Sequence, residues 1–124
     1  MGRLQAISRP WKIGNMEIKN RTVMAAMGIH SQRMVNHDNS YTQDGIDYFV
    51  ERAKGGIGLI ITGGMAVQNK YDSVEGGNCV LNSGDEFITN TRKLTDEVHK
   101  YGAKIVCQLS AASGRTAPDR KSVV

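Results

Sequence analysis

The sequence is poor in cysteine and proline and has no long apolar run. Its 124 residues include two cysteines and two prolines. The cysteines form no Cys-x-x-Cys pattern, which argues against a zinc ribbon or a disulfide framework. The longest strongly apolar segment, around residues 59–61, is far too short to span a membrane. The N-terminus also lacks the apolar run of a signal peptide, so we expect a cytoplasmic protein with no membrane partner.

Several functional motifs are missing as well. No Gly-x-Gly-x-x-Gly follows the first predicted strand, and no P-loop is present. No pair of carboxylates stands at a spacing that argues for hydrolysis. His30 and His37 lie in an irregular segment without a third ligand, so we expect no metal site. The net charge of +4 is modest, and the basic residues 115–121 have no interleaved aromatic side chains, which argues against nucleic-acid binding.

The composition is that of one ordinary globular domain. Hydrophobic residues make up 40% of the chain and charged residues 23%. Alternating apolar residues predict a hairpin over residues 11–18, with its turn at Gly14-Asn15. A short apolar run predicts a buried strand over residues 22–27, and the polar residues 28–41 predict a loop.

A helix is expected over residues 42–54, because apolar residues recur there at the spacing of one helix face. Thr42 suits the N-cap position, and Gly55-Gly56 suits the C-terminal stop. The near-continuous apolar residues 57–62 then predict a parallel strand covered on both faces.

Residues 63–82 show no clear periodicity and predict a long loop. A second helix is expected over residues 84–101, with Ser83 and Glu86 as a capping box. Residues 104–109 predict a third parallel strand, in which Cys107 reads as a small buried side chain. The expected buried face of the second helix consists of Phe87, Thr91, Leu94, Val98 and Tyr101.

A hairpin followed by three strands that alternate with two helices indicates an α/β fold with a parallel sheet. A doubly wound nucleotide-binding sheet and a (β/α)8 barrel both contain such units. The connections after the strands are long and those after the helices are short, which favours the barrel. We therefore expect the N-terminal part of a (β/α)8 TIM barrel.

The three predicted strand ends carry mostly small or apolar residues, with two exceptions, Thr62 and Gln108. Small residues let a flat ring lie against the backbone, and a carboxamide offers the donor and acceptor that suit an imide edge. Turn glycines and an amide that caps the sheet edge explain the same residues without a ligand. The residues alone leave both readings open.

The chain resembles the Old Yellow Enzyme family of NADH:flavin oxidoreductases in three stretches that occur in the family's order. "KIGNMEIKNRTVMAAM" resembles the bottom-capping hairpin that leads through Lys-Asn-Arg into the first barrel strand. "DYFVERAKGGIGLIITGG" resembles the first helix and second strand, and "LTDEVHKYGAKIVCQL" the second helix and third strand. The 2-enoate reductase and 2,4-dienoyl-CoA reductase-like branch is the most similar.

The resemblance implies a partial FMN-binding barrel domain over residues 1–124, with NAD(P)H as reductant and an activated alkene as substrate. It places Gln108 at the pyrimidine edge of FMN, the backbone of Ala25, Ala26 and Met27 along the isoalloxazine, and Gly64 near the ring. No catalytic residue is assigned, because the resemblance implies that the family's substrate-binding pair and proton donor lie beyond Val124. Gly28 stands where some members carry a cysteine or threonine.

Two other readings stay open. A non-catalytic partial barrel can act as an interaction or assembly module through exposed strand edges. Another (β/α)8 enzyme without flavin fits the same element order. In either case the incomplete barrel is expected to associate with itself or with the remainder of the barrel.

Overall fold

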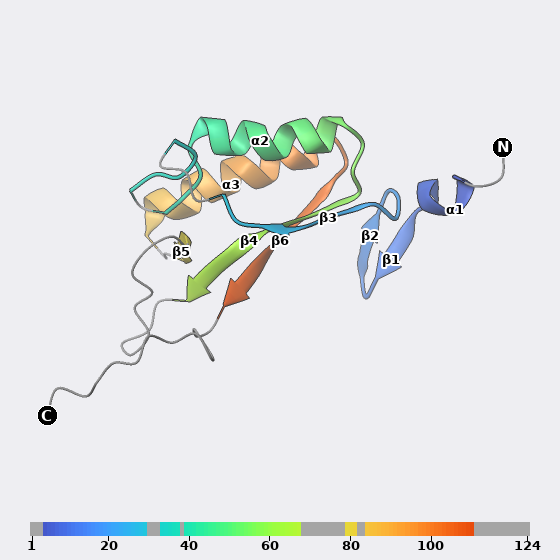
Figure 1. Ribbon diagram of the computed structural model, residues 1–124, viewed down its shortest axis with the longest axis horizontal. Helices are drawn as coiled ribbons and strands as arrows, with labels where there is room; N and C mark the ends of the chain where they lie inside the picture. The colour runs from blue at the N-terminus through green and yellow to red at the C-terminus, as the bar shows by residue number, and fades with distance from the viewer. Residues whose placement is uncertain (1–3, 30–32, 38, 68–78, 82–83, 111–124) are drawn as a thin grey trace, which may run out of the picture.

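A computed structural model describes residues 4–29, 33–37, 39–67, 79–81 and 84–110. No helix in these ranges has the length and apolar character needed to cross a bilayer. In chain order the elements are α1 (Gln5–Ser8), β1 (Trp11–Ile13), β2 (Met16–Ile18), β3 (Val23–Met27), α2 (Gln43–Lys54), β4 (Leu59–Val67), β5 (Cys79–Leu81), α3 (Asp85–His99) and β6 (Lys104–Ser110) (Figure 1).

The N-terminal hairpin forms as predicted. Strands β1 and β2 pair antiparallel, with Ile13 opposite Met16. Gly14 has a φ of 57°, which only glycine adopts without strain. The hairpin lies at the N-terminal end of β3, away from the arrowheads of β4 and β6 (Figure 1).

A parallel sheet follows the hairpin, so the expected α/β architecture is confirmed. Strand β4 lies between β3 and β6, and all three run in the same direction. The strand after α2 was predicted to end at Thr62, but β4 continues to Val67 and then pairs with β5. Because β6 occupies one edge of β4 as far as Ala66, β5 lies on the edge that β3 leaves at Thr62. The prediction that residues 63–82 form one long loop is therefore wrong at both ends, and residues 68–78 lie outside the described part.

Helix α2 begins and ends at the predicted residues. The Thr42 side chain accepts a hydrogen bond from the Gly45 backbone N–H at 3.3 Å. Asp44 lies in the first turn, where a negative charge favours the helix dipole. After the helix, Gly56 has a φ of 95°, which ends the helix and turns the chain toward β4.

Helix α3 starts differently from the prediction. Its N-cap is Gly84, which has no side chain to accept a hydrogen bond, so the predicted capping box is wrong. Ser83 itself lies outside the described residues. The helix ends at His99, and Tyr101 is 40% exposed rather than part of the buried face. Phe87, Leu94 and Val98 are buried as expected.

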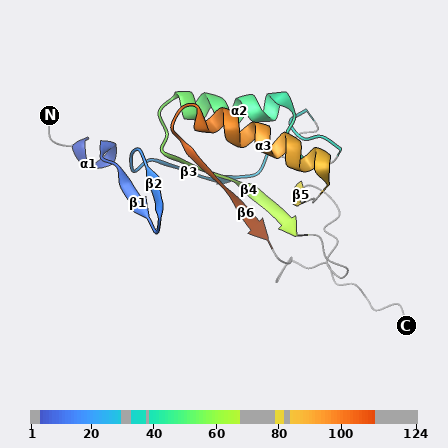
Figure 2. The same cartoon turned by 180° about the vertical axis from the view of Figure 1, so that it is seen from behind.

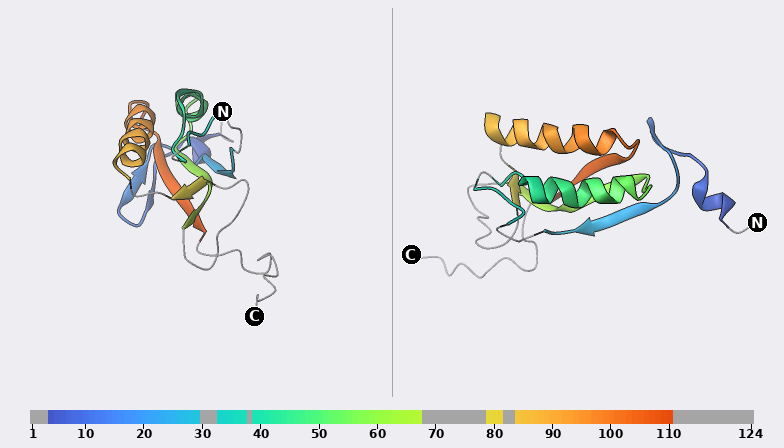
Figure 3. Two further views of the ribbon diagram at one scale, coloured as in Figure 1. Left: turned by 90° about the vertical axis from the view of Figure 1, so that its left-hand side faces the viewer. Right: turned by 90° about the horizontal axis from the view of Figure 1, so that it is seen from above.

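Both long helices cover the same face of the sheet. They run side by side above the strands in Figure 2 and in the left panel of Figure 3, and the right panel looks down on them. The core between helices and sheet includes Phe49 and Val98, which are fully buried, and Ile60 near the start of β4. No described helix covers the opposite face, where Val23 is 46% exposed.

Cys107 does not lie in this core. The prediction of a buried thiol is wrong, because Cys107 is exposed. Its sulfur lies 3.2 Å from the sulfur of Met65, near the C-terminal end of the sheet, where the described helices give little cover. The apolar run of β6 is thus half-buried at Ile105 and Val106 and exposed from Cys107 to Leu109.

Candidate functional site

The C-terminal ends of β3, β4 and β6 meet at one edge of the sheet (Figure 1). In (β/α)8 folds this edge carries the active site, because the loops that follow the strands gather there. All five residues singled out in the sequence, Ala25, Ala26, Met27, Gly64 and Gln108, lie in the last half of their strands or within three residues of this edge.

Gly64 and Gln108 lie directly side by side. They are Cα partners in the ladder between β4 and β6. A Cβ atom built on Gly64 would lie 3.5 Å from the Gln108 side-chain oxygen, and no closer atom surrounds it. The neighbouring Met65 belongs to the core under the helices, so Gly64 and Gln108 face the other side of the sheet. The structure thus places an exposed carboxamide beside an open stretch of backbone.

Gly63 has a different reason to be glycine. A Cβ atom there would lie 2.3 Å from the Cα of Gly28 and 2.8 Å from the carbonyl oxygen of Met27. The backbone of β4 therefore approaches the end of β3 more closely than any side chain allows. The two adjacent glycines serve separate purposes, one for packing and one for an open surface.

The three candidate residues of β3, Ala25, Ala26 and Met27, lie along the edge of β4 opposite to β6. Met27 is the Cα partner of Thr62, two positions before Gly64. Ala25 and Met27 are exposed, and Ala26 is half-buried. Strand pairing thus brings Ala25, Ala26 and Met27 close to Gly64 on one edge of β4, and Gln108 pairs with the other edge.

The described part of the loop after β3 is held against α3 at the same end of the sheet. Ser40 is fully buried, and its hydroxyl oxygen accepts hydrogen bonds from the side-chain amides of Asn36 and Asn90, at 3.0 Å and 3.1 Å. Tyr41 packs edge-on against Phe49 in the core. The sequence suggested only an irregular polar loop here, because the bond that ties it to α3 joins Ser40 to Asn90, 50 residues further along the chain.

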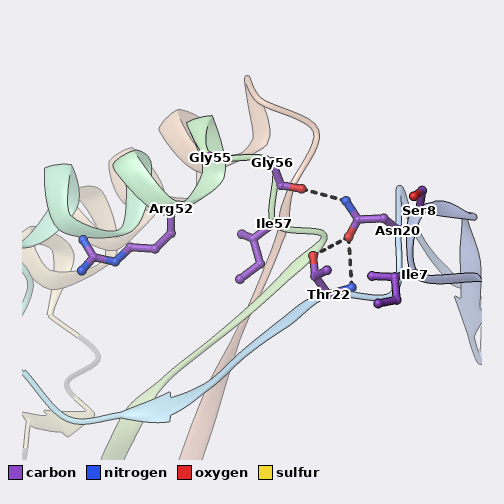
Figure 4. A pocket seen from close by; sticks show the side chains of 8 residues that line it. All are labelled: Ile7, Ser8, Asn20, Thr22, Arg52, Gly55, Gly56 and Ile57. Carbon is purple, nitrogen blue, oxygen red and sulfur yellow. Dashed lines mark hydrogen bonds between the residues drawn. The ribbon is translucent and has the colours of Figure 1, made fainter. Parts of the chain in front are cut away.

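A cavity lies at the opposite end of the sheet, between the N-terminal segment and the turn before β4 (Figure 4). At its wall the Asn20 side chain donates to the carbonyl oxygen of Gly56 at 2.7 Å and accepts from the backbone N–H and hydroxyl of Thr22 at 3.1 and 2.6 Å. Asn20 thus joins the hairpin to the α2–β4 turn. The Asn20 amide is used for hydrogen bonds within the chain, which indicates a structural role for this end of the sheet.

Lys19 and Arg21, on either side of Asn20, also contact other parts of the chain. Lys19 donates to the carbonyl oxygen of Tyr101 at 2.6 Å, and the Arg21 guanidinium lies 4.1 Å from the ring centre of Trp11. The Lys-Asn-Arg segment therefore contacts three separate parts of the chain. An asparagine side chain that accepts from the backbone N–H two residues later is a common turn signal. Asn20 does this with Thr22, just before β3 begins at Val23.

We expect Asn20→Ala to lower the free energy of unfolding of the full-length protein by about 2–3 kcal/mol, since three partly buried hydrogen bonds are lost. Urea denaturation measures this change. Gln5→Ala is the matched control, because it removes an exposed amide from α1. Equal midpoints for the two variants would contradict the structural role of Asn20.

Within the described residues, three exposed ion pairs lie at the two long helices and the loop before α2. The Asp44 carboxylate, which accepts a hydrogen bond from Arg33, raises the pKa of the guanidinium above its ordinary value. Hydrogen bonds to Glu51 and Glu97 likewise raise the pKa values of Lys54 and Lys100. Groups with raised pKa values stay cationic at neutral pH, so Arg33, Lys54 and Lys100 give fixed positive charge at the surface.

Comparison with known proteins agrees with this geometry. The sequence profile of the NADH:flavin oxidoreductase / NADH oxidase family matches residues 6–122. The chain belongs to this family. Old Yellow Enzyme from a Pichia species superposes with a TM-score of 0.72 at 28% identity, covering 90% of this chain and 28% of that one. The Old Yellow Enzyme of Trypanosoma cruzi gives a TM-score of 0.67 at 30% identity, with 90% and 28% coverage.

Curated relatives of this NADH:flavin oxidoreductase chain include two long enzymes. Cinnamate reductase of Clostridium sporogenes is 46% identical over 110 residues, which is 87% of this chain and 16% of the relative. NADH oxidase of Thermoanaerobacter brockii is 40% identical over 108 residues, 86% of this chain and 16% of the relative. The chain thus spans about a sixth of these relatives, and the described sheet corresponds to the first strands of their family's TIM barrel.

Proposed function

We propose that this chain supplies the first part of an FMN-dependent oxidoreductase, which transfers a hydride from NAD(P)H through flavin to an activated alkene such as an enone or enoate. The name of the Clostridium relative supports the substrate class, because cinnamate is an enoate. The observation that carries the proposal is the Gln108 carboxamide beside the open backbone of Gly64 at the C-terminal edge of the sheet.

These residues fit a flat heteroaromatic ring. The glycine leaves a surface that a Cβ would partly fill, and no atom nearer than the Gln108 oxygen crowds it. Gln108 is exposed at the same edge, so its amide can bond both a ring N–H and a ring carbonyl. The backbone of Ala25, Ala26 and Met27 offers further hydrogen-bonding groups along the adjacent strand.

Bound FMN supplies the hydride chemistry. In the proposal, Gln108 holds the pyrimidine edge and thereby sets the position of the ring in its plane. Gly64 lets the ring approach the sheet, and the backbone of residues 25–27 borders it on the β3 side. The apolar Met27 side chain, 59% exposed, keeps water from part of this surface.

Replacing Gln108 by leucine tests the proposal. We expect Gln108→Leu in the full-length protein to weaken FMN binding by about 1–3 kcal/mol, because the imide edge loses its partner. Fluorescence titration of the apoprotein with FMN measures the change. Gln5→Leu, an exposed amide on α1, is the control and should bind FMN normally. An unchanged affinity in Gln108→Leu would remove Gln108 from the site.

A second candidate function is assembly without catalysis. It rests on the uncovered face of the sheet, where Val23 and Met27 are 46% and 59% exposed. The colour of the purified full-length protein separates the two candidates. A yellow protein with a flavin spectrum supports the oxidoreductase, and a colourless protein that associates through this face supports the assembly module.

A further inference from the structure

Two irregularities in strand pairing occur beside the candidate site. Between β4 and β6 the register advances from Ile61 to Gly64 on one strand but only from Val106 to Gln108 on the other. Strand β4 therefore carries one extra residue at Thr62-Gly63. Such bulges re-aim side chains near functional sites and leave a ladder group without its regular partner.

A matching irregularity lies on the other edge of β4. From Met24 to Met27 the chain advances three residues along β3, and from Ile60 to Thr62 only two along β4. The extra residue here falls at Ala25-Ala26, which are themselves candidate site residues. Thr62 is adjacent to both irregularities, through its pairing with Met27 and its place in the β4 bulge.

The Thr62 hydroxyl occupies the gap that the β4 bulge opens. The residue is only 3% exposed. Its hydroxyl oxygen accepts a hydrogen bond from the backbone N–H of Gln108 at 3.4 Å and donates to the carbonyl oxygen of Gly63 at 3.1 Å. Buried hydroxyls are costly without partners, and these two bonds satisfy Thr62 while tying the Gln108 backbone to β4.

We propose that Thr62 is a positioning residue for the flavin site, which acts by fixing the main chain of Gln108 so that its carboxamide stands over Gly64. The inference rests on the proposed function, since it requires Gln108 to bind the ring. Its physical basis is that a side chain can be aimed only as well as the Cα that carries it, and the Thr62 hydroxyl holds the backbone N–H of Gln108 where the β4 bulge interrupts the regular register.

The test compares three substitutions in the full-length protein. Thr62→Val keeps the shape of the side chain and replaces the hydroxyl with a methyl group. Thr62→Ala removes both the hydroxyl and the methyl group. Thr62→Ser keeps the hydroxyl and removes the methyl group. We expect Thr62→Val and Thr62→Ala to weaken FMN binding about three- to tenfold, the effect of one lost hydrogen bond. Thr62→Ser should retain the wild-type affinity even if its melting temperature falls.

Two further readouts separate positioning from general stability. The flavin midpoint potential of the hydroxyl-free variants should shift in the same direction as that of Gln108→Leu, because both loosen the same ring contact. Adding Thr62→Val to Gln108→Leu should weaken FMN binding no further, since residues acting through one another are not additive.

The outcomes are distinguishable. Normal FMN affinity and potential in Thr62→Val, together with weak binding in Gln108→Leu, would overturn the role of Thr62 and leave the proposed function standing. Normal binding in Gln108→Leu would overturn both. Weaker FMN binding in Thr62→Ser and Thr62→Ala, together with normal binding in Thr62→Val, would assign the effect to packing of the methyl group and reject the hydroxyl.

Discussion

A Gly64→Val variant of the full-length protein is expected to lose FMN while it keeps its fold. Gly64 has no left-handed φ, so a residue with a side chain is not strained there. The nearest atom to an added Cβ is the Gln108 side-chain oxygen at 3.5 Å, an ordinary contact distance. Valine also favours strand conformation, so β4 should form normally.

The added methyl groups would occupy the surface on which we place the flavin ring. A rigid planar ring cannot rotate away from the added methyl groups. Overpacking of this kind costs ~1–3 kcal/mol, and we expect the affinity for FMN to fall by about 100-fold. The measurements are the flavin-to-protein ratio from absorbance and the melting temperature of the apoprotein. Stoichiometric flavin in Gly64→Val would contradict the proposed site.

Gly63→Ala is the matched comparison one residue away. Its added Cβ would lie 2.3 Å from the Cα of Gly28, and neither backbone can yield without moving β3 against β4. We expect this smaller substitution to lower the melting temperature clearly, whereas Gly64→Val leaves it nearly unchanged. The opposite order would mean that the open surface at Gly64 is misassigned.

The second large effect concerns residues 1–124 expressed by themselves. We expect this polypeptide to show no NADH oxidation with an enone acceptor and to associate in solution. The sheet face away from the helices exposes apolar side chains such as Val23 and Met27, 46% and 59% exposed. A closed barrel buries this face among eight strands, so the isolated piece must cover it in another way.

Size-exclusion chromatography with added FMN, followed by the activity assay, measures both properties. The full-length protein under the same conditions is the control and should turn over. A monomer of residues 1–124 that binds FMN tightly and oxidises NADH would show that the first strands form a working site alone.

Local pattern was enough to predict the elements whose signals lie within one segment. Helix α2 was predicted to within one residue at its start and correctly at its end, because its apolar spacing, the Thr42 cap and the glycines after Lys54 are all local. The hairpin turn at Gly14 and the parallel sheet followed for the same reason. The five candidate residues were also placed at the correct edge of the sheet, since parallel strands end together.

Pairing between distant segments decided the rest. The glycines at 63 and 64 look like a turn in the sequence, yet β4 runs through them because Gly28 approaches from β3 and Gln108 pairs from β6. Cys107 looks buried, but its exposure depends on which elements cover the end of β6. The sequence by itself determined the elements and their order, because periodicity and capping are properties of short segments. Only the tertiary structure decided the bulges, the place of Thr62 and the anchor of Asn20, because they depend on strand pairing and on bonds such as Asn20–Gly56 and Gln108–Thr62, which join residues 36 and 46 positions apart in the chain.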